Sequence, residues 1–260
     1  MKIGYGQSGY RVRFDWGPMG ADAVAPGAAF VAVVDVLSFT TTLTVAAEQG
    51  ISVLPYRWRD DSAVELAHRH GAMLAVLRSQ AGPGQITLSP ESIMRADLKG
   101  AGVDRLVLPS PNGSAISVRL ADAGVTVVGV SLRNAAAAAA WVREQAGDRP
   151  VAVVAAGERW PDGSLRPAAE DLWGAGAFLD GLDPAGGFSP EARTAVAAYR
   201  GVAAGLDVAL AESVSGRELR SMGFEGDVAV AAAIGASTVV PVLREGWFVP
   251  GDHRLDSPRR

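Results

Sequence analysis

Short apolar runs alternate with segments of helical pattern along most of the chain. The clearest run, Ala29–Val36, carries four valines and is typical of a strand that is covered on both faces. Thr40–Gln49 follows as a predicted helix, with hydroxyl residues at its start and Gly50 after its end. Further strands are predicted at Ile51–Leu54, Ala72–Leu77, Arg105–Leu108, Val125–Val130 and Val151–Ala155, and further helices from Asp60 or Asp61 to Gly71, over Ser114–Ala123 and from Asn134 to about Ala146. This alternation predicts a three-layer α/β/α fold with a mainly parallel or mixed sheet.

The last hundred residues are mainly helical by the same criteria. Helices are predicted at Ala168–Leu179, Pro190–Ala204, Val214–Met222 and Asp227–Ile234, and two closing strands at Thr238–Leu243 and Trp247–Val249. We expect one domain over residues 1–250 and a loose tail over 251–260. The strand Val33–Val36, which leads into Ser38, resembles Val127–Val130, which leads into Ser131. An internally duplicated core would explain this likeness, although any parallel α/β protein offers such echoes.

Composition narrows the range of chemistry. The 260 residues include no Cys, which excludes a disulfide framework, a thiolate metal site and a cysteine nucleophile. The 24 Lys and Arg against 28 Asp and Glu give a net charge of −4 and no general attraction to nucleic acid. The most apolar stretch, Val228–Leu243, has 16 residues and is too short to span a bilayer of about 30 Å. We therefore expect a cytoplasmic protein without a membrane or nucleic-acid partner.

A glycine pattern near the N-terminus raises one alternative. Gly4, Gly6 and Gly9 have the spacing of a dinucleotide-binding loop, which would indicate a nucleotide-dependent oxidoreductase. Such a loop follows a strand and opens a helix, whereas Tyr10–Phe14 alternates like a strand. An N-terminal loop without a nucleotide is the better interpretation.

Polar residues gather where the predicted strands end. Asp35 lies at the carboxyl end of the most hydrophobic strand, where parallel sheets bind ligands, and would act as a Mg²⁺ ligand or an acid/base group. Its alternative role is to accept hydrogen bonds from loop amides. Ser38, Thr40 and Thr41 follow at a helix start, where hydroxyls and free amides suit a phosphate but also form ordinary caps.

The loops after the later strands carry further candidates. They hold the small turn Asn112, Gly113 and Ser114, the pair Arg133 and Asn134, the pair Glu158 and Arg159, and the helix start Glu170 and Asp171. Each set has an ordinary interpretation as a tight turn, a helix cap or a solvated charge. In a parallel sheet, however, these loops emerge at one edge, and carboxylates, guanidinium groups and hydroxyls together suit a divalent cation beside a phosphorylated anion.

Ordered segments of the chain resemble one family. Val33–Leu37, Pro111–Ser114, Ala156–Glu158 and Glu170–Asp171 followed by Gly174–Gly176 look like the 2-phosphosulfolactate phosphatase family, as do Ser215–Leu219, Gly223 and Asp227. The resemblance implies a Mg²⁺-dependent cytoplasmic phosphatase with an α/β/α fold that converts 2-phospho-3-sulfolactate to sulfolactate and phosphate, a step toward coenzyme M. This chain has Ser38 where the family usually has Arg, and it lacks the Asp and Asn of the family pattern over Gln85–Pro90.

These observations lead to two functional hypotheses. The first is a Mg²⁺-dependent phosphatase acting on a small phosphorylated organic acid, and the second is a non-catalytic anion-binding relative; a homodimer is left open in either case. In the first, Asp35, Glu158, Glu170 and Asp171 are the metal-ligand candidates, Asp35, Arg133 and Arg159 are the catalytic candidates, and Ser38, Thr40, Thr41, Asn112, Gly113, Ser114 and Asn134 are the phosphate-binding candidates.

Overall fold

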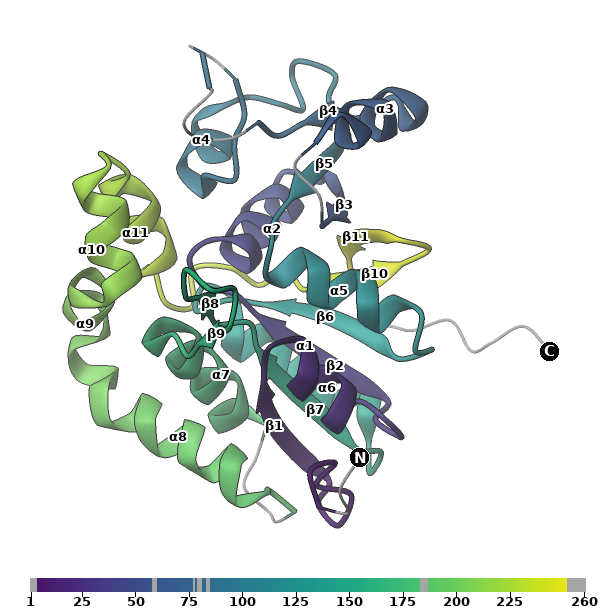
Figure 1. Cartoon of the computed structure of the whole chain (residues 1–260), viewed down its shortest axis with the longest axis vertical. Helices are drawn as coiled ribbons and strands as arrows, with labels where there is room; N and C mark the ends of the chain where they lie inside the picture. The colour runs from purple at the N-terminus through teal and green to yellow at the C-terminus, as the bar shows by residue number, and fades with distance from the viewer. Residues whose placement is uncertain are drawn as a thin grey trace.

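The computed structural model describes residues 4–57, 60–76, 78, 81–82, 85–182 and 187–251. Within these residues a nine-stranded sheet lies at the centre, with helices on both faces (Figure 1). Its strand order is β1 (Val12–Trp16), β7 (Val151–Ala155), β2 (Phe30–Val34), β6 (Thr126–Val130), β10 (Pro241–Arg244), β11 (Trp247–Pro250), β3 (Ser52–Tyr56), β5 (Arg105–Pro109) and β4 (Met73–Leu74). The predicted α/β class and mixed, mainly parallel sheet are confirmed.

The sheet consists of two parallel groups that run in opposite directions. Strands β1, β7, β2 and β6 are parallel to one another, and so are β3, β5 and β4. The hairpin of β10 and β11 lies between the groups and is antiparallel to β6 on one side and to β3 on the other. Three antiparallel pairings therefore separate the groups. The sequence predicted one edge of the sheet at which the carboxyl ends of the parallel strands meet. Because the two groups run in opposite directions, their carboxyl ends form two separate sets.

Alternating side chains of the strands fill two separate cores. Phe30, Ala32 and Val34 of β2 face one core, whereas Val31 and Val33 face the other. The first core is covered by α6 (Ala135–Ala146), α7 (Ala169–Gly181) and α8 (Pro190–Val202), and the second by α1 (Gly17–Val24), α2 (Phe39–Glu48) and α5 (Gly113–Ala121). The expected three layers follow from burial on both faces of the sheet.

Most predicted element positions are confirmed, and the differences have local causes. Helix α3 spans Asp61–His70 with Asp60 as its cap. In the described part of the predicted strand Ala72–Leu77, Met73–Leu74 pairs with β5 at the sheet edge and Val76 forms an isolated bridge with Thr87; Leu77 lies outside the described residues. Two helices lie in segments for which no element is predicted. They are α1, with Pro18 in its first turn, and α4 (Pro90–Arg95), capped by Ser89.

The C-terminal half is helical, as predicted, up to the closing hairpin. Helix α8 passes through a short 3₁₀ turn into α9 (Leu206–Glu212), followed by α10 (Val214–Ser221) and α11 (Glu225–Ala231). Figure 1 shows α8 running along the outside of α7 and the last three helices stacked beside it. The combined run Pro190–Glu212 is long and apolar enough to cross a membrane by length and composition alone, which is weak evidence for a span. The predicted loose tail lies largely outside the described residues.

The two similar strand–loop–helix units lie side by side but differ in packing. Strands β2 and β6 are parallel neighbours, with Val33 opposite Gly129. Helix α2 after β2 packs on one face of the sheet, however, and α6 after β6 packs on the other.

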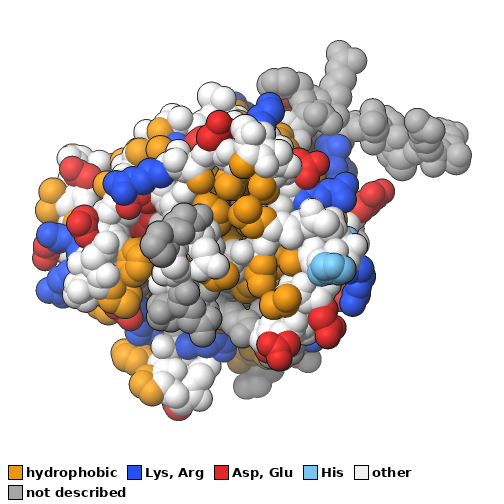
Figure 2. Space-filling model, turned by 90° about the horizontal axis from the view of Figure 1, so that it is seen from above, with side chains coloured by type: hydrophobic (Ala, Val, Ile, Leu, Met, Phe, Trp, Pro, Cys, Tyr) orange, Lys and Arg blue, Asp and Glu red, His pale blue; other side chains and the backbone are white. Residues whose placement is uncertain are grey.

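Neither sign of charge dominates the face of the molecule seen in Figure 2, where acidic and basic side chains are interspersed around an apolar centre.

Candidate active site

Asp35 lies directly after β2 and is held by the starts of two helices. Its Oδ1 accepts a hydrogen bond from the backbone N–H of Phe39 at 3.3 Å, and its Oδ2 accepts one from the N–H of Gly113 at 2.7 Å. The side chain is 5% exposed. Because both helix starts present N–H groups to it, the carboxylate is stabilised and fixed in one orientation.

The hydroxyl residues after Asp35 tighten this loop. Thr40 Oγ1 donates to the carbonyl of Asp35 at 2.8 Å and accepts from its N–H at 3.1 Å, and Thr41 Oγ1 donates to the carbonyl of Val36 at 2.7 Å. Both threonines are fully buried. These two phosphate-binding candidates therefore use their hydroxyls on the backbone and support the Asp35 loop from behind.

The loop after β5 approaches Asp35 very closely at Gly113. A Cβ atom built on Gly113 would lie 2.4 Å from the Phe39 ring and 2.7 Å from Asp35 Oδ2, so this contact requires glycine. Strand β5 runs opposite to β2 across the sheet, and it is α5, packed against both β2 and β3, that brings this loop to Asp35. The predicted meeting of Asp35 and Gly113 is present, but the shared edge of a parallel sheet does not cause it.

Asp171 joins the loops that follow β2 and β7. Its Oδ1 accepts from the N–H of Val36 at 2.7 Å, and its Oδ2 accepts from the N–H of Gly157 at 2.8 Å. Burial, the negative charge of Asp35 and that of Glu170 raise the pKa of Asp171 well above its ordinary value, while the bond from Val36 acts against this. Both oxygens of Asp171 accept from backbone amides, as those of Asp35 do, but Asp171 is not among the residues that line the cavity described below.

Two more carboxylates lie near Asp35. Glu158, from the small hairpin of β8 (Glu158–Arg159) and β9 (Leu165–Arg166), is half-buried, and its Oε2 accepts from Asn112 Nδ2 at 3.0 Å. Burial and the charge of Asp35 raise the pKa of Glu158 to about 7. Glu170 is 2% exposed, and its carboxylate receives no hydrogen bond from any residue that the structure describes. Its charge also acts on Glu158 and Asp171.

A cavity of about 250 Å³ opens over these groups. Four predicted site residues line it, namely Asp35, Ser38, Asn112 and Glu158. Its other walls are Leu37, Arg78, Leu88, Ser110, Pro111 and the α10 side chains Ser215, Glu218, Leu219 and Met222. The geometry therefore brings Asp35, Asn112 and Glu158, which are far apart in the sequence, to one cavity.

Other candidates lie away from the cavity. Ser114 Oγ donates to the carbonyl of Leu108. Asn134 Oδ1 accepts from the N–H of Ser131, and Asn134 Nδ2 donates to the carbonyls of Gly129 and Val239. Arg133 forms a two-oxygen contact with Glu48 at 3.0 and 3.1 Å. Arg159 is exposed and donates to the carbonyl of Gly163. None of these four side chains lines the cavity, and we leave them out of the proposed site.

Arg78 is the most important residue that the sequence reasoning missed. It directly follows the predicted strand Ala72–Leu77, so the rule that selected Asp35 at a strand end also applies to it. It was overlooked because the segment after it has no regular pattern. Asp227, which was noted only as part of the family resemblance, holds this arginine from α11 at 2.7 Å.

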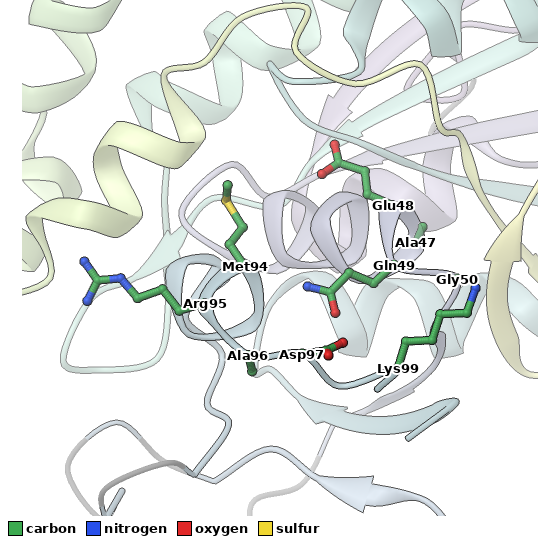
Figure 3. Close-up of a pocket in the computed structure, with 9 residues that line it drawn as sticks. All are labelled: Ala47, Glu48, Gln49, Gly50, Met94, Arg95, Ala96, Asp97 and Lys99. Atoms are coloured by element: carbon green, nitrogen blue, oxygen red, sulfur yellow. The ribbon is translucent and has the colours of Figure 1, made fainter. Parts of the chain in front are cut away.

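A larger hollow of about 580 Å³ lies elsewhere, between α2 and α4. Its charged side chains are Glu48, Arg95, Asp97 and Lys99. Figure 3 shows Arg95 and Lys99 pointing away from each other and Glu48 pointing away from Asp97. Because these groups do not converge on one point, this hollow offers no reacting geometry comparable to that around Asp35.

The raised pKa of Glu158 predicts how stability depends on pH in metal-free protein. The folded state holds this proton more tightly than the unfolded state, so its stabilising effect is present below about pH 4.5 and is lost as the pH rises to about 7. We expect the unfolding free energy of Glu158→Gln, relative to that of the parent, to rise by about 1–3 kcal/mol as the pH goes from 5 to 8. Solvent screens part of the repulsion, which limits the rise to this range. Urea unfolding in EDTA measures this difference; a constant difference across the range would contradict the prediction.

Comparisons with known proteins point in one direction. The family model described as 2-phosphosulpholactate phosphatase matches residues 22–246. A protein of Thermus thermophilus named "Probable 2-phosphosulfolactate phosphatase" is 33% identical over 221 residues, which cover 82% of this chain and 87% of that protein. A protein of Deinococcus radiodurans with the same name is 32% identical over 227 residues, covering 84% of this chain and 89% of that protein.

Proposed function

The chain belongs to the 2-phosphosulfolactate phosphatase family, whose members are phosphoric monoester hydrolases, and from this premise we propose its reaction. We propose that it is a Mg²⁺-dependent phosphatase that hydrolyses a small phosphorylated organic acid of the 2-phosphosulfolactate type to the hydroxy acid and phosphate. The observation that supports this most is the single cavity lined by Asp35, Ser38, Asn112 and Glu158. A carboxylate, a hydroxyl and an amide there face a space of the size needed for a small phosphate ester.

The residues present fit a Mg²⁺ ion. Glu170 is buried, receives no hydrogen bond among the described residues, and lies close enough to Glu158 to raise its pKa. Such a group of carboxylates is costly unless a proton or a cation offsets its charge. No set of three or more His, Asp or Glu in the described part of the chain could hold a metal ion by itself. Mg²⁺ commonly keeps several waters and uses only one or two carboxylates, with substrate phosphate oxygens completing its coordination.

The protein's own groups then have distinct roles. When bound, Mg²⁺ would neutralise charge on the phosphoryl oxygens, and one or two of the carboxylates Asp35, Glu158 and Glu170 would hold it together with waters and phosphate oxygens. Asp35, fixed by the N–H groups of Phe39 and Gly113, would orient the water that attacks phosphorus. Ser38 and Asn112 would donate hydrogen bonds to phosphate oxygens. In hydrolysis the oxygen of the attacking water bonds to phosphorus as the ester P–O bond breaks, and the leaving oxygen takes up a proton that the water loses.

Phosphate release from a panel of phosphorylated hydroxy acids tests this function. We expect release that requires Mg²⁺, stops on addition of EDTA and returns with excess Mg²⁺. The panel includes 2-phosphosulfolactate and analogues that replace the sulfonate by a carboxylate or a hydroxyl. Phosphate release from none of the esters, by protein that is folded by circular dichroism, would refute the proposal and favour a non-catalytic anion-binding relative.

Replacing Glu170 by Gln should raise stability without metal and reduce the stabilisation that Mg²⁺ provides. Without metal at pH 7.5, the variant should be more stable than the parent by about 1 kcal/mol, because one of several close buried charges is gone. With Mg²⁺, its rise in melting temperature should be smaller than that of the parent, because one negative group near the ion is lost. Thermal melts with EDTA and with 10 mM Mg²⁺, roughly a saturating amount for such sites, compare the two.

The matched control for this experiment is Glu144→Gln. Glu144 is exposed on α6, so its substitution should alter neither the metal-free stability nor the response to Mg²⁺. An equal Mg²⁺ response in Glu170→Gln and the parent would remove Glu170 from the proposed metal site.

A further inference from the structure

Arg78 reaches the cavity from a segment far from the other site residues in the sequence. Its Nη2 donates to Asp227 Oδ2 at 2.7 Å and to Ser38 Oγ at 2.9 Å, and its guanidinium lies over the ring of Phe224, 5.1 Å from the ring centre. The side chain is 19% exposed. One side of Arg78 is therefore fixed by α11 and the other reaches the start of α2.

Asp227 fixes the position of this arginine. Its side chain is fully buried, its Oδ2 faces Arg78, and its Oδ1 accepts from Ser89 Oγ and from the N–H of Glu91 at 3.2 Å. Asp227 Oδ1 is thus held by groups outside the cavity lining, and Oδ2 holds Arg78. A buried carboxylate with this set of partners keeps the guanidinium in one place at little further entropic cost.

Charge around the cavity makes Arg78 distinctive. Among the described residues that line it, Arg78 is the sole cation, beside the acids Asp35, Glu158 and Glu218. Arg166 lies nearby and lowers the pKa of Glu158, but it is outside the lining and donates to Ser215 Oγ at 3.3 Å. Among the described lining residues, Arg78 is therefore the one that can offer a fixed positive charge to a phosphate ester in this cavity.

Arg78 also has hydrogen-bonding capacity to spare. Its Nε is buried and has no acceptor among the residues that the structure describes. Arg133 has the same kind of unfilled Nε and a carboxylate partner, Glu48, but it does not line the cavity. The protein therefore satisfies the Arg78 guanidinium only in part, and an oxyanion against the 19% of the side chain that is exposed would add to its partners.

We propose that Arg78 binds the phosphoryl group of the substrate, as the cavity's own cationic contact, and that Asp227 positions it for this role. The inference rests on the proposed function, since it assigns a residue to the phosphate at that same site. Ser38 shares the arrangement, because its hydroxyl accepts a hydrogen bond from Arg78 and Ser38 lines the same cavity. The phosphate would lie against Arg78 and Ser38, with the metal on the side of the carboxylates.

Binding of inorganic phosphate in the presence of Mg²⁺ tests the role of Arg78. The variant is Arg78→Met with Asp227→Asn, which fills the space of the arginine and removes the carboxylate charge that would otherwise be left buried and unpaired. We expect it to fold, to bind phosphate about 10- to 100-fold more weakly than the parent in isothermal titration, and to lose activity mainly through a higher KM. Phosphate affinity equal to that of the parent would overturn the proposal.

Two further variants separate charge from structure. Arg200→Ala with Asp180→Asn removes an exposed ion pair between α7 and α8 and should bind phosphate as the parent does. Arg78→Lys keeps a cation and should bind phosphate more tightly than the Met and Asn variant. Equal loss in both Arg78 variants would show that shape rather than charge matters, and would also overturn the proposal.

The outcomes distinguish this inference from the proposed function. If the parent hydrolyses esters and binds phosphate but the Met and Asn variant binds phosphate equally well, the inference fails alone. If the parent binds phosphate without hydrolysing any ester and the variant binds it more weakly, the proposed function fails and the role of Arg78 stands. A parent that neither hydrolyses esters nor binds phosphate overturns both.

Discussion

Replacing Asp35 by Asn should lower kcat/KM for phosphate release by at least about 10³-fold while the chain stays folded. The carboxylate contributes the negative charge that would hold Mg²⁺ and orient the attacking water, and a neutral amide supplies neither effect. One of the N–H groups of Phe39 and Gly113 would also face an NH₂ group instead of an oxygen. We therefore expect a loss of about 1–3 kcal/mol in unfolding free energy as well.

Phosphate release under saturating Mg²⁺ and urea unfolding together test this prediction. Asp180→Asn, at the far end of α7 and paired with Arg200 on the surface, is the matched control and should keep its activity within about twofold. If Asp35→Asn kept its activity within tenfold of the parent, Asp35 would not be the central carboxylate of the site. If it failed to fold, activity of Asp35→Ser would replace it as the measurement.

Replacing Gly113 by Ala should disrupt the site through packing alone. The added methyl group would lie 2.4 Å from the Phe39 ring and 2.7 Å from Asp35 Oδ2, so the α5 start must move away from Asp35. Overpacking of this kind costs about 1–3 kcal/mol. Because catalysis depends on the exact placement of reacting groups, we expect kcat to fall about 100-fold or more.

The control for this substitution is Gly201→Ala. Gly201 lies in α8, and no atom lies within 4 Å of a Cβ built on it. Alanine is a better helix former than glycine, so this variant should gain about 0.5–1 kcal/mol and keep full activity. Full activity and stability in Gly113→Ala would mean that the two loops do not approach as closely as the structure indicates.

The sequence was most informative where local physics determines the outcome. Strand β7 has the predicted bounds of Val151–Ala155, because a continuous apolar run between turn signals leaves few alternatives. Asp35 could be selected because a carboxylate at the end of a buried strand needs a partner. Helix α3 begins after Asp60, one of its two predicted caps, and α8 begins at Pro190, as predicted.

Contacts between distant segments could not be predicted in this way. Arg78 meets Asp227 across 149 positions and Ser38 across 40, and no periodicity of the chain reports such pairs. Arg133 was selected for its place after a strand, but Glu48 on a neighbouring helix pairs with it. The direction of β5 relative to β2 depends on the closing hairpin, and nothing local to β5 shows where that hairpin inserts.

The insertion of β10 and β11 between the two groups of strands has a consequence for biosynthesis. Asp35 and Asn112 are both translated early, yet the piece of sheet that joins their strands lies beyond residue 240. A nascent chain still on the ribosome holds both parts of the site without the hairpin that links them. Catalytic competence should therefore emerge only after the hairpin has been translated.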